Sequence, residues 1–354
     1  MSTGNFICPC TAGKQFFSAP LVLVEKCAIL RTCIYDRRGS PGCKRRFLPM
    51  EPARSAPLRR KAPKRRKNAM PRPRRVRRRS RRLLKLFLFC ILCVVFFQWS
   101  NHSLQTVWPT FSSPRLPEGF DGCVIVQLSD LHGAEFGEGN EDLIRRVREI
   151  HPDYIFLTGD LQDQYRQTPR SYSVSLGRAM AEIAPSYFVT GNHEWALRDV
   201  RALKRELQEA GVTVLTNEYT TLTRNGSVIL LAGIDDPNGF ADQKTPEELA
   251  KELRAAEPDA FWLLLAHRNN YFQREYSRLG ADLVISGHGH GGLIRLPFTD
   301  GLISVERSLF PSYTAGFYQV NGSDLFVSRG LGNSGRTFRL FNRPELVVLT
   351  LKRG

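Results

Sequence analysis

The residues of this chain that are best suited to chemistry follow the ends of short apolar runs. Gly191-Asn192-His193-Glu194 comes directly after residues 187–190, an apolar run that predicts a buried strand. In open α/β sheets, ligands bind at the carboxyl ends of the strands, and a glycine there lets the chain turn sharply. We therefore predict that the amide of Asn192 and the imidazole of His193 lie at a ligand-binding edge of a sheet.

Four other predicted strands end in groups of the same kind: Asp130-Leu131-His132 after 124–128, Gly159-Asp160 after 154–158, His267 after 261–266, and Gly287-His288-Gly289-His290 after 283–286. Five of the seven histidines of the chain therefore follow predicted strands. Histidines scattered through a core or over a surface would not share this position. The motifs thus predict one common site.

The side chains in these motifs form a set of oxygen and nitrogen donors without a thiolate. Carboxylates, imidazoles and one amide suit Mn²⁺, Fe or Zn²⁺ better than Ca²⁺, which prefers oxygen ligands alone. Two cations held ~3.5–4 Å apart need a bridging group, and a carboxylate can bridge with its two oxygens. Asp160 is the natural candidate because it closes a central strand, while His288 and His290 are placed to give one imidazole to each cation.

In their order along the chain, the five motifs resemble the signature of calcineurin-like metallophosphoesterases. That signature is D-x-H, then G-D, then G-N-H-[DE], a later lone H, and G-H-x-H, and all five blocks occur between Asp130 and His290. The resemblance extends over roughly residues 123–351. It is greatest to the membrane-anchored or secreted bacterial branch, which residues 327–335 and 343–346 support.

The resemblance implies a role for each of these residues. It implies seven metal ligands on two divalent cations, with Asp160 as the bridge: Asp130, His132 and His290 on one cation, and Asn192, His267 and His288 on the other. His193 would bind no metal, but would face the substrate and protonate the leaving oxygen. A hydroxide bridging the cations would be the nucleophile in hydrolysis of a phosphomonoester or phosphodiester. The implied fold is α/β, with two mixed β-sheets packed as a sandwich flanked by helices.

Several neighbouring residues have two interpretations. Asp163 supports the site or is a solvated loop acid, and Glu194 caps the following helix or orients a ligand. Arg329 and Arg336 contact a phosphate or lie at the rim of the core, which is the more frequent finding for arginine. The sequence after His193 is not H-E-x-x-H, because position 197 is leucine, so a zinc-protease motif is excluded.

The positive charge of the chain is confined to its N-terminal part. Residues 1–99 hold 25 Lys and Arg against three Asp and Glu, a net charge of +22, whereas residues 100–354 hold 26 against 31, a net charge of −5. Only one of the eight cysteines, Cys123, lies beyond residue 99. The C-terminal part therefore has no internal disulfide and no bias toward nucleic acid.

Residues 1–82 are predicted to form a disordered basic arm. Residues 1–69 show no sustained helical or strand period, and residues 54–82 are dense in Arg, Lys and Pro, a composition that cannot bury a core. We expect the natural start to be Met70, because a basic segment followed by an apolar one begins there. We expect this arm to touch anionic lipid rather than nucleic acid.

Residues 83–99 are predicted to be a transmembrane anchor. Residues 86–97 contain no polar side chain, and seventeen helical residues span about 25 Å, slightly less than the ~30 Å hydrocarbon core. The alternatives to an anchor are a buried core helix and, more plausibly, a cleaved signal peptide. Residues 98–102 are bulky and offer no signal-peptide cleavage site. The arginines before the anchor predict a cytoplasmic N-terminus and a catalytic domain outside the cytoplasm.

After the anchor we predict a linker over residues 100–122 and a catalytic domain over residues 123–354. Predicted helices cover 141–150 (capped by Asn140), 171–183, 196–210, 246–256 and 270–279. Further predicted strands cover 212–215, 220–223, 228–234, 313–320, 325–328 and 346–351. The early alternation of strands and helices predicts parallel pairing. The late run of strands predicts a second, more antiparallel sheet.

These observations predict a membrane-anchored, metal-dependent phosphoesterase. Tethering near a bilayer suggests a lipid-linked or envelope-derived phosphoester as substrate. The alternatives are a binding or scaffold protein on a degenerate phosphoesterase fold, and a nucleic-acid binder that uses the basic arm. Every metal position of the motif is filled, which favours the enzyme over the scaffold.

Overall fold

The strands that precede the predicted motifs lie in two β-sheets of the computed structural model, which describes residues 74–239, 243–296 and 299–354. The first sheet has the order β1-β13-β3-β4-β5-β6, and β2 also pairs with β13. Neighbours from β3 to β6 are parallel, as predicted, and β13 runs antiparallel to β3. The strands are β1 (Gln105–Val107), β2 (Thr110–Ser112), β3 (Val124–Leu128), β4 (Tyr154–Leu157), β5 (Ser186–Phe188), β6 (Thr213–Val214) and β13 (Glu345–Lys352).

The second sheet is antiparallel only at its two edges. Its order is β11-β12-β10-β9-β8-β7, with antiparallel β7/β8 and β11/β12 pairs around a parallel centre. The parallel centre arises because long connections return the chain to the same end of the sheet before β9 and β10. The strands are β7 (Glu218–Arg224), β8 (Ser227–Ile234), β9 (Trp262–Arg268), β10 (Leu283–Gly287), β11 (Gly316–Val320) and β12 (Ser323–Val327).

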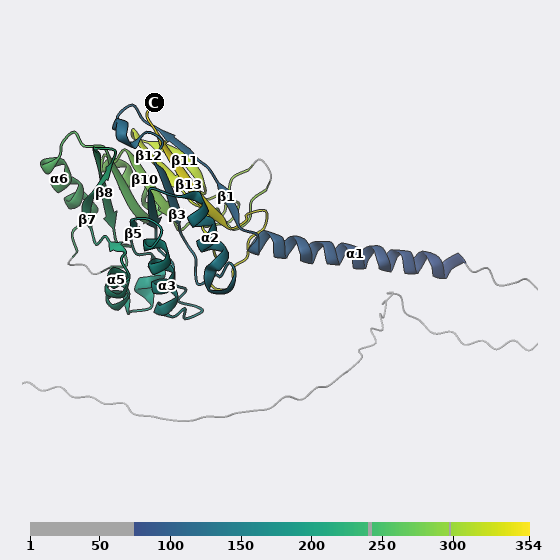
Figure 1. Ribbon diagram of the computed structural model, residues 1–354. Helices are drawn as coiled ribbons and strands as arrows, with labels where there is room; N and C mark the ends of the chain where they lie inside the picture. Colours follow the sequence, from purple (N-terminus) through teal and green to yellow (C-terminus); the bar gives the residue numbers. More distant parts are fainter. Residues whose placement is uncertain (1–73, 240–242, 297–298) are drawn as a thin grey trace, which may run out of the picture. The chain divides into compact units, whose positions relative to one another are not determined.

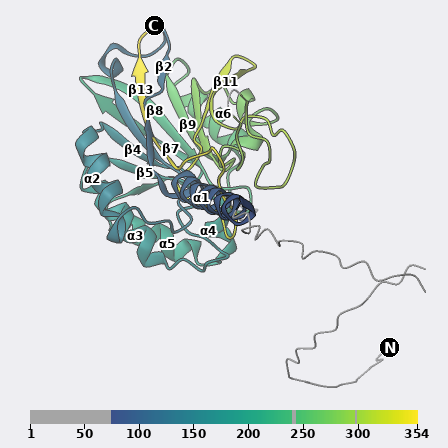
Figure 2. The ribbon, with the colours of Figure 1, turned by 90° about the vertical axis from the view of Figure 1, so that its right-hand side faces the viewer.

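Three apolar clusters show how the layers pack. Between the sheets, Phe156 and Leu349 of the first meet Leu231 and Leu265 of the second. The other face of the first sheet is covered by α2 (Glu141–Ile150), α3 (Arg170–Ala181) and α5 (Val200–Glu209), and that of the second by α6 (Pro246–Ala256). Figure 1 shows the helices and the two sheets as successive layers. Figure 2 shows α2, α3 and α5 on the side away from α6. The predicted two-sheet sandwich with flanking helices is confirmed.

Two helix predictions coincide with the observed bounds, and one is wrong. α2 and α6 cover the predicted residues, and α6 begins with a capping box in which the Thr245 hydroxyl accepts from the Glu248 N–H at 3.2 Å. The predicted helix over 270–279 is instead two 3₁₀ turns, Asn269–Tyr271 and Tyr276–Arg278. The buried Phe272, Tyr276 and Leu279 have helical spacing, but two tight turns bury the same positions.

The predicted capping role of Asn140 is wrong. Its side chain makes no capping bond to α2. The amide oxygen instead accepts from the backbone N–H of Phe136 at 3.1 Å, and the amide nitrogen donates to the Tyr172 hydroxyl at 3.2 Å. Asn140 has a φ of 69°, so its side chain faces back into the preceding loop. Asparagine tolerates this left-handed backbone better than most residues do.

The segment that we expected to be a linker belongs to the folded domain. Within 100–122, β1 and β2 both pair in parallel with β13. Phe111, Leu116 and Phe120 of this segment are buried between the sheets. The prolines at 109, 114 and 117 indicated a linker, but proline is also tolerated beside edge strands, which is where β1 and β2 lie.

One helix, α1 (Arg74–His102), contains the predicted anchor and extends beyond it. Its portion Arg79–His102 has 24 residues and contains an 18-residue window with a mean hydropathy of 2.2, which is long and apolar enough to cross a membrane by length and composition. Residues 74–82 are helical rather than disordered, because arginine favours helix and no proline interrupts the run. The rest of the predicted arm and the predicted start at Met70 lie outside the described residues.

Candidate active site

All eight predicted site residues lie at one edge of the sandwich, at or just after the carboxyl ends of strands from both sheets. The first sheet supplies the residues after β3, β4 and β5, and the second supplies His267 near the end of β9 and the two histidines after β10. Five of them have left-handed backbone, with φ between 47° and 67°: Asp130, His132, Asp160, His288 and His290. Such conformations are costly for residues other than glycine and concentrate at functional sites. Here they turn the side chains inward as soon as each strand ends.

Gly191 allows a close approach between two of the motifs. A Cβ atom at this position would lie 2.2 Å from the Asp160 Oδ1 atom. That oxygen accepts the backbone N–H of His193 at 2.9 Å. Across the two sheets, the carboxylate of Asp130 accepts the backbone N–H of His288 at 3.0 Å. Backbone hydrogen bonds therefore join the motifs to one another as well as to their own strands.

One cluster of donor atoms forms around His132 and His290. Their Nε2 atoms lie 3.0 Å apart, with Asp130 Oδ1 at 3.5 Å from His290 Nε2 and Asp160 Oδ2 at 3.7 Å from His132 Nε2. Burial lowers the pKa of His132 to about 3. Burial, together with the charge of Arg339, holds the pKa of His290 well below its usual range. Both rings are therefore neutral at pH 7, which metal ligation requires.

A second cluster forms around His267 and His288. His267 Nε2 lies 3.2 Å from Asp160 Oδ2 and 3.2 Å from His288 Nδ1. The other ring nitrogen of His267 donates to the Thr158 carbonyl at 2.8 Å, which directs Nε2 inward. Asn192 Oδ1 is buried and has no hydrogen-bond partner among the described residues. An unpaired buried amide oxygen on a residue that lines the same cavity as His288 fits a cation ligand.

Asp160 carries the negative charge that faces both clusters. Burial alone would raise its pKa, but His267 and the other histidines lower it well below the usual range. In return, the Asp160 carboxylate outweighs the burial of His267 and raises the pKa of that ring to about 10. A buried carboxylate in this position requires a positive charge, which a divalent cation also supplies. The residues present thus fit divalent metal.

His193 lies beside the two clusters and is held through its other ring nitrogen. Its Nδ1 accepts the backbone N–H of Gln164 at 3.1 Å, so in the neutral ring the proton is on Nε2. Nε2 lies 3.3 Å from the Ser334 hydroxyl and 4.0 Å from Asp160 Oδ2. Burial would lower the pKa of His193, but the Asp163 and Asp160 carboxylates raise it.

The alternatives for Asp163 and Glu194 are now resolved. Asp163 is fully buried, with one oxygen accepting from Tyr165 N at 2.8 Å and the other from Gly335 N at 2.6 Å, and it lies 3.5 Å from His193 Nδ1. His132, Asp163 and His193 lie close enough for a third donor group. Because Asp163 and His193 Nδ1 already accept backbone hydrogen bonds, that group needs no cation.

Glu194 caps the short helix Asn192–Ala196, as one of its two interpretations predicted, rather than facing the cavity. Its carboxylate accepts the backbone N–H groups of Asp160, Gly191 and Gln162 at 2.9, 2.8 and 3.1 Å. Burial raises its pKa to about 7. The bonds hold two adjacent motifs in register, so Glu194 positions Asp160.

The side chains open into a cavity of about 230 Å³, which is also lined by residues that sequence reasoning missed. Arg268 lines it, with its guanidinium held by Asp236 at 2.6 Å. Glu306 lies 3.5 Å from His288 Nε2. Tyr165 and Ser334 border His193. Only Arg268 had a local signal, since it directly follows the His267 motif; the others come from irregular loops.

Arg339 is the largest residue near the site that the sequence did not predict. No motif surrounds it, because it lies far beyond the last motif of the chain. It is fully buried and donates to the Gly332 and Arg329 carbonyls at 2.6 and 2.8 Å. Of the two arginines considered for phosphate binding, Arg329 pairs with Glu345, and Arg336 is exposed. Neither lines the cavity.

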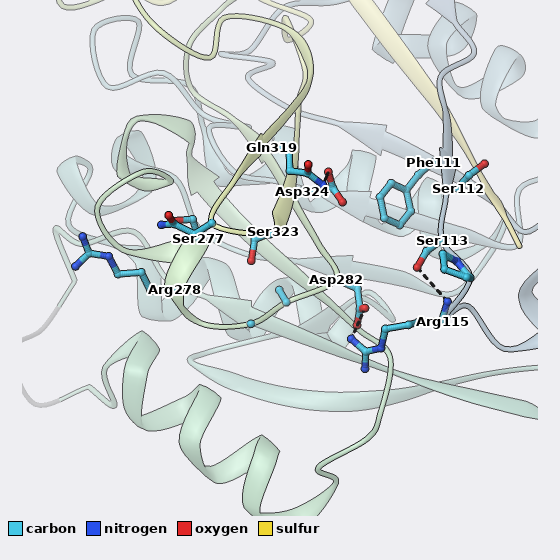
Figure 3. A pocket seen from close by; sticks show the side chains of 15 residues that line it. Phe111, Ser112, Ser113, Arg115, Ser277, Arg278, Asp282, Gln319, Ser323 and Asp324 are labelled. Carbon is cyan, nitrogen blue, oxygen red and sulfur yellow. Dashed lines mark hydrogen bonds and ion pairs between the residues drawn. The ribbon is translucent and has the colours of Figure 1, made fainter. Parts of the chain in front are cut away.

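A larger cavity of about 810 Å³ lies at the other end of the sandwich, before β10 rather than after it. Figure 3 shows the ion pair there between Arg115 and Asp282, whose atoms lie 2.6 Å apart. None of the described residues that line it is a histidine. The predicted motifs therefore do not contribute to this larger cavity.

Comparison with known proteins identifies the family. A sequence model described as calcineurin-like phosphoesterase matches residues 123–292. An uncharacterized metallophosphoesterase of Bacillus subtilis, YkuE, is 32% identical over 261 residues, covering 71% of this chain and 86% of that protein. The chain belongs to the calcineurin-like phosphoesterase family.

Two further relatives extend the comparison, and one of them is named as a transmembrane protein. An uncharacterized Aquifex aeolicus metallophosphoesterase is 30% identical, covering 69% of this chain and 90% of that protein. A bovine "transmembrane protein with metallophosphoesterase domain" is 33% identical, and the match covers 67% of this chain but only 55% of the relative. The bacterial relatives are consistent with the bacterial branch. Family and donor clusters together identify a metal-dependent phosphoesterase with a candidate membrane helix.

Proposed function

We propose that this phosphoesterase hydrolyses phosphomonoesters or phosphodiesters with two divalent cations, each Mn, Fe or Zn. The observation that carries the proposal is the position of Asp160 Oδ2, 3.7 Å from His132 Nε2 and 3.2 Å from His267 Nε2. Asp130, His132 and His290 would hold one cation, Asn192, His267 and His288 the other, and Asp160 both. When bound, the cations would neutralise phosphoryl oxygens and lower the pKa of water.

His193 is proposed as the general acid. In the imidazolium form, which the Asp163 and Asp160 carboxylates favour, its Nε2–H would donate to the phosphoryl group and then protonate the leaving oxygen, leaving the neutral ring. The Gln164 N–H and the Asp163 carboxylate hold the ring so that Nε2 faces the cavity. Arg268, fixed by Asp236, would add positive charge at the mouth of the cavity for the substrate's phosphate.

The proposed setting is a membrane surface. We place the basic N-terminus in the cytoplasm and the phosphoesterase domain on the opposite side, because arginines precede the apolar part of α1. A substrate carried in or near the bilayer, such as a lipid-linked or envelope phosphoester, then meets the cavity at high local concentration. Preferential hydrolysis of soluble nucleotides over vesicle-borne phosphoesters by the full chain would contradict this assignment.

The function is tested with the full chain purified in detergent. Hydrolysis of p-nitrophenyl phosphate and of its bis-ester is measured with added Mn²⁺ or Zn²⁺ and with chelator. We expect turnover that chelator abolishes and added metal restores. Two bound cations without turnover on any phosphoester would instead support the scaffold alternative, and turnover that survives complete metal removal would contradict the proposal.

A further inference from the structure

The C-terminal end of α1 is fixed to the phosphoesterase domain by specific contacts. The side chain of Asn101 accepts from Arg339 N at 2.7 Å and donates to Arg339 O at 3.0 Å. Phe96 packs on Phe341 and Phe97 on Phe338, with ring centroids 4.8 and 5.8 Å apart. The candidate membrane span therefore ends against one defined face of the domain.

A cavity of about 430 Å³ lies at this junction, and we call it the interfacial pocket. Its lining includes Trp99 near the end of α1, Phe341, and three arginines: Arg295, Arg329 and Arg343. No carboxylate is among the described residues that line it. It shares no lining residue with the catalytic cavity.

The arginines are held in place largely by uncharged groups. Arg343 donates to the Ser103 carbonyl at 3.0 Å and hydroxyl at 2.8 Å, and its guanidinium lies over the Trp99 ring, 4.8 Å from the centroid. Arg295 donates to the Gly291 carbonyl at 2.9 Å, and its nearest carboxylate, on Asp300, lies 3.6 Å away and is largely exposed. Only Arg329 has a close buried partner, Glu345. The pocket thus retains an excess of fixed positive charge.

The depth of the pocket is set by the membrane helix. Trp99 lies three residues before the end of the 24-residue apolar span, and tryptophan prefers the membrane–water interface. Phosphates of lipid headgroups occupy the same depth. The rim carries exposed apolar side chains, Leu296 at 45% and Phe341 at 46% exposure. These are suited to contact an acyl chain, which a soluble phosphate does not have.

From this arrangement we propose that the interfacial pocket binds the phosphate of an anionic phospholipid from the bilayer that α1 crosses. Guanidinium groups bind phosphate oxygens through paired, charge-assisted hydrogen bonds. The proposal rests on α1 spanning a membrane and is independent of the catalytic assignment.

Lipid binding here would fix the height of the active site above the bilayer. Ser334, which contacts His193, and Phe338, which packs on Phe97, are four residues apart on one segment. Arg339 in the same segment is bonded to the carbonyl of Arg329, a pocket residue. The pocket, the end of α1 and the catalytic cavity are thus joined through a single short stretch of chain.

The test uses the full chain in nanodiscs that contain trace lipid with a photoreactive headgroup. Phosphatidylglycerol and phosphatidylcholine are the two probes, and cross-linked peptides are mapped by mass spectrometry. We expect cross-links at residues 99–105 and 341–343 about tenfold more abundant with phosphatidylglycerol, and lost in the double variant Arg295→Gln/Arg343→Gln. The matched control, Arg146→Gln/Arg254→Gln, removes two exposed charges outside the pocket.

Cross-links within the basic residues 1–82 provide an internal standard, because the variants leave that arm unchanged. Equal labelling of the pocket by the two lipids in the wild-type chain would overturn the proposal even if the double variant does not fold. Unchanged labelling in a double variant that melts like wild type would also overturn it. Loss of wild-type labelling in excess inorganic phosphate would assign the pocket to a soluble anion instead.

Discussion

Asp163 shows how burial distinguishes two side chains that look alike in the sequence. Nothing in the residues around Gly159-Asp160 separates a solvated loop acid from a support for His193. The structure buries Asp163 completely and gives both of its oxygens backbone donors from Tyr165 and Gly335. The carboxylate also lies 3.5 Å from His193 Nδ1 and 3.6 Å from Arg166 Nε, so we expect Asp163 to position the His193 ring.

Asp163→Asn therefore tests positioning apart from metal binding. The amide keeps one acceptor oxygen but removes the charge beside His193, so we expect kcat to fall about 10- to 100-fold with metal content unchanged. Turnover and metal content are measured on the same sample, with Asp121→Asn, far from the cavity, as the control. A loss of metal that parallels the loss of turnover would show that Asp163 acts on the metal site instead.

Cys123 provides a prediction from a pKa outside the site. Burial, followed by the charge of Asp153, raises the pKa of this thiol to about 12. The thiol is therefore neutral up to about pH 12 in the folded domain, whereas an exposed cysteine ionises near pH 8.5. We expect Cys123 to resist alkylation at pH 8.5 and to react fast after unfolding. Rapid labelling of the native domain would contradict its placement.

The eight site residues could be predicted because each follows its own apolar run, a local pattern. Arg339, Glu306 and Ser334 could not, because their positions depend on irregular loops that approach the site from far along the chain. The distances between the two clusters of donor atoms could not be predicted from the sequence either. They depend on how the two sheets pack.

At the scale of elements, strands with strong apolar runs were predicted and short edge strands were not. β1 and β2 have three residues each and are flanked by prolines, so their composition indicates a linker. Their pairing with β13 is a contact across more than two hundred residues. Local composition carries no information about such a pairing, which explains the misplaced domain boundary.

The boundary is tested by two truncated chains. One that starts at Ser100 keeps β1 and β2, whereas one that starts at Cys123 loses them together with Phe111, Leu116 and Phe120. At ~1.5–3 kcal/mol for each of the three buried side chains, the loss is roughly 5–9 kcal/mol, comparable with the whole stability of a domain. We expect only the longer chain to melt cooperatively by circular dichroism. Equal melting temperatures would restore the linker interpretation.

At the scale of the whole molecule, charge and hydropathy separate two functions of the chain. Positive charge precedes the apolar part of α1, and the mildly acidic remainder contains the phosphoesterase fold. The sequence predicted this division because composition alone determines it. The close attachment of α1 to the domain, through Asn101 and Arg339, arises from tertiary contacts and was not predictable.

The central claim is that two cations share Asp160 while His193 acts as an acid without binding metal. The most direct measurement is the metal content per chain, by plasma mass spectrometry, alongside turnover of p-nitrophenyl phosphate for the wild type, Asp160→Asn and His193→Ala. We predict about two metals in the wild type and in His193→Ala, whose turnover falls roughly 10²–10⁴-fold, and loss of both metal and turnover in Asp160→Asn. A wild-type chain that holds no metal, or a His193→Ala variant with full turnover, would contradict the account.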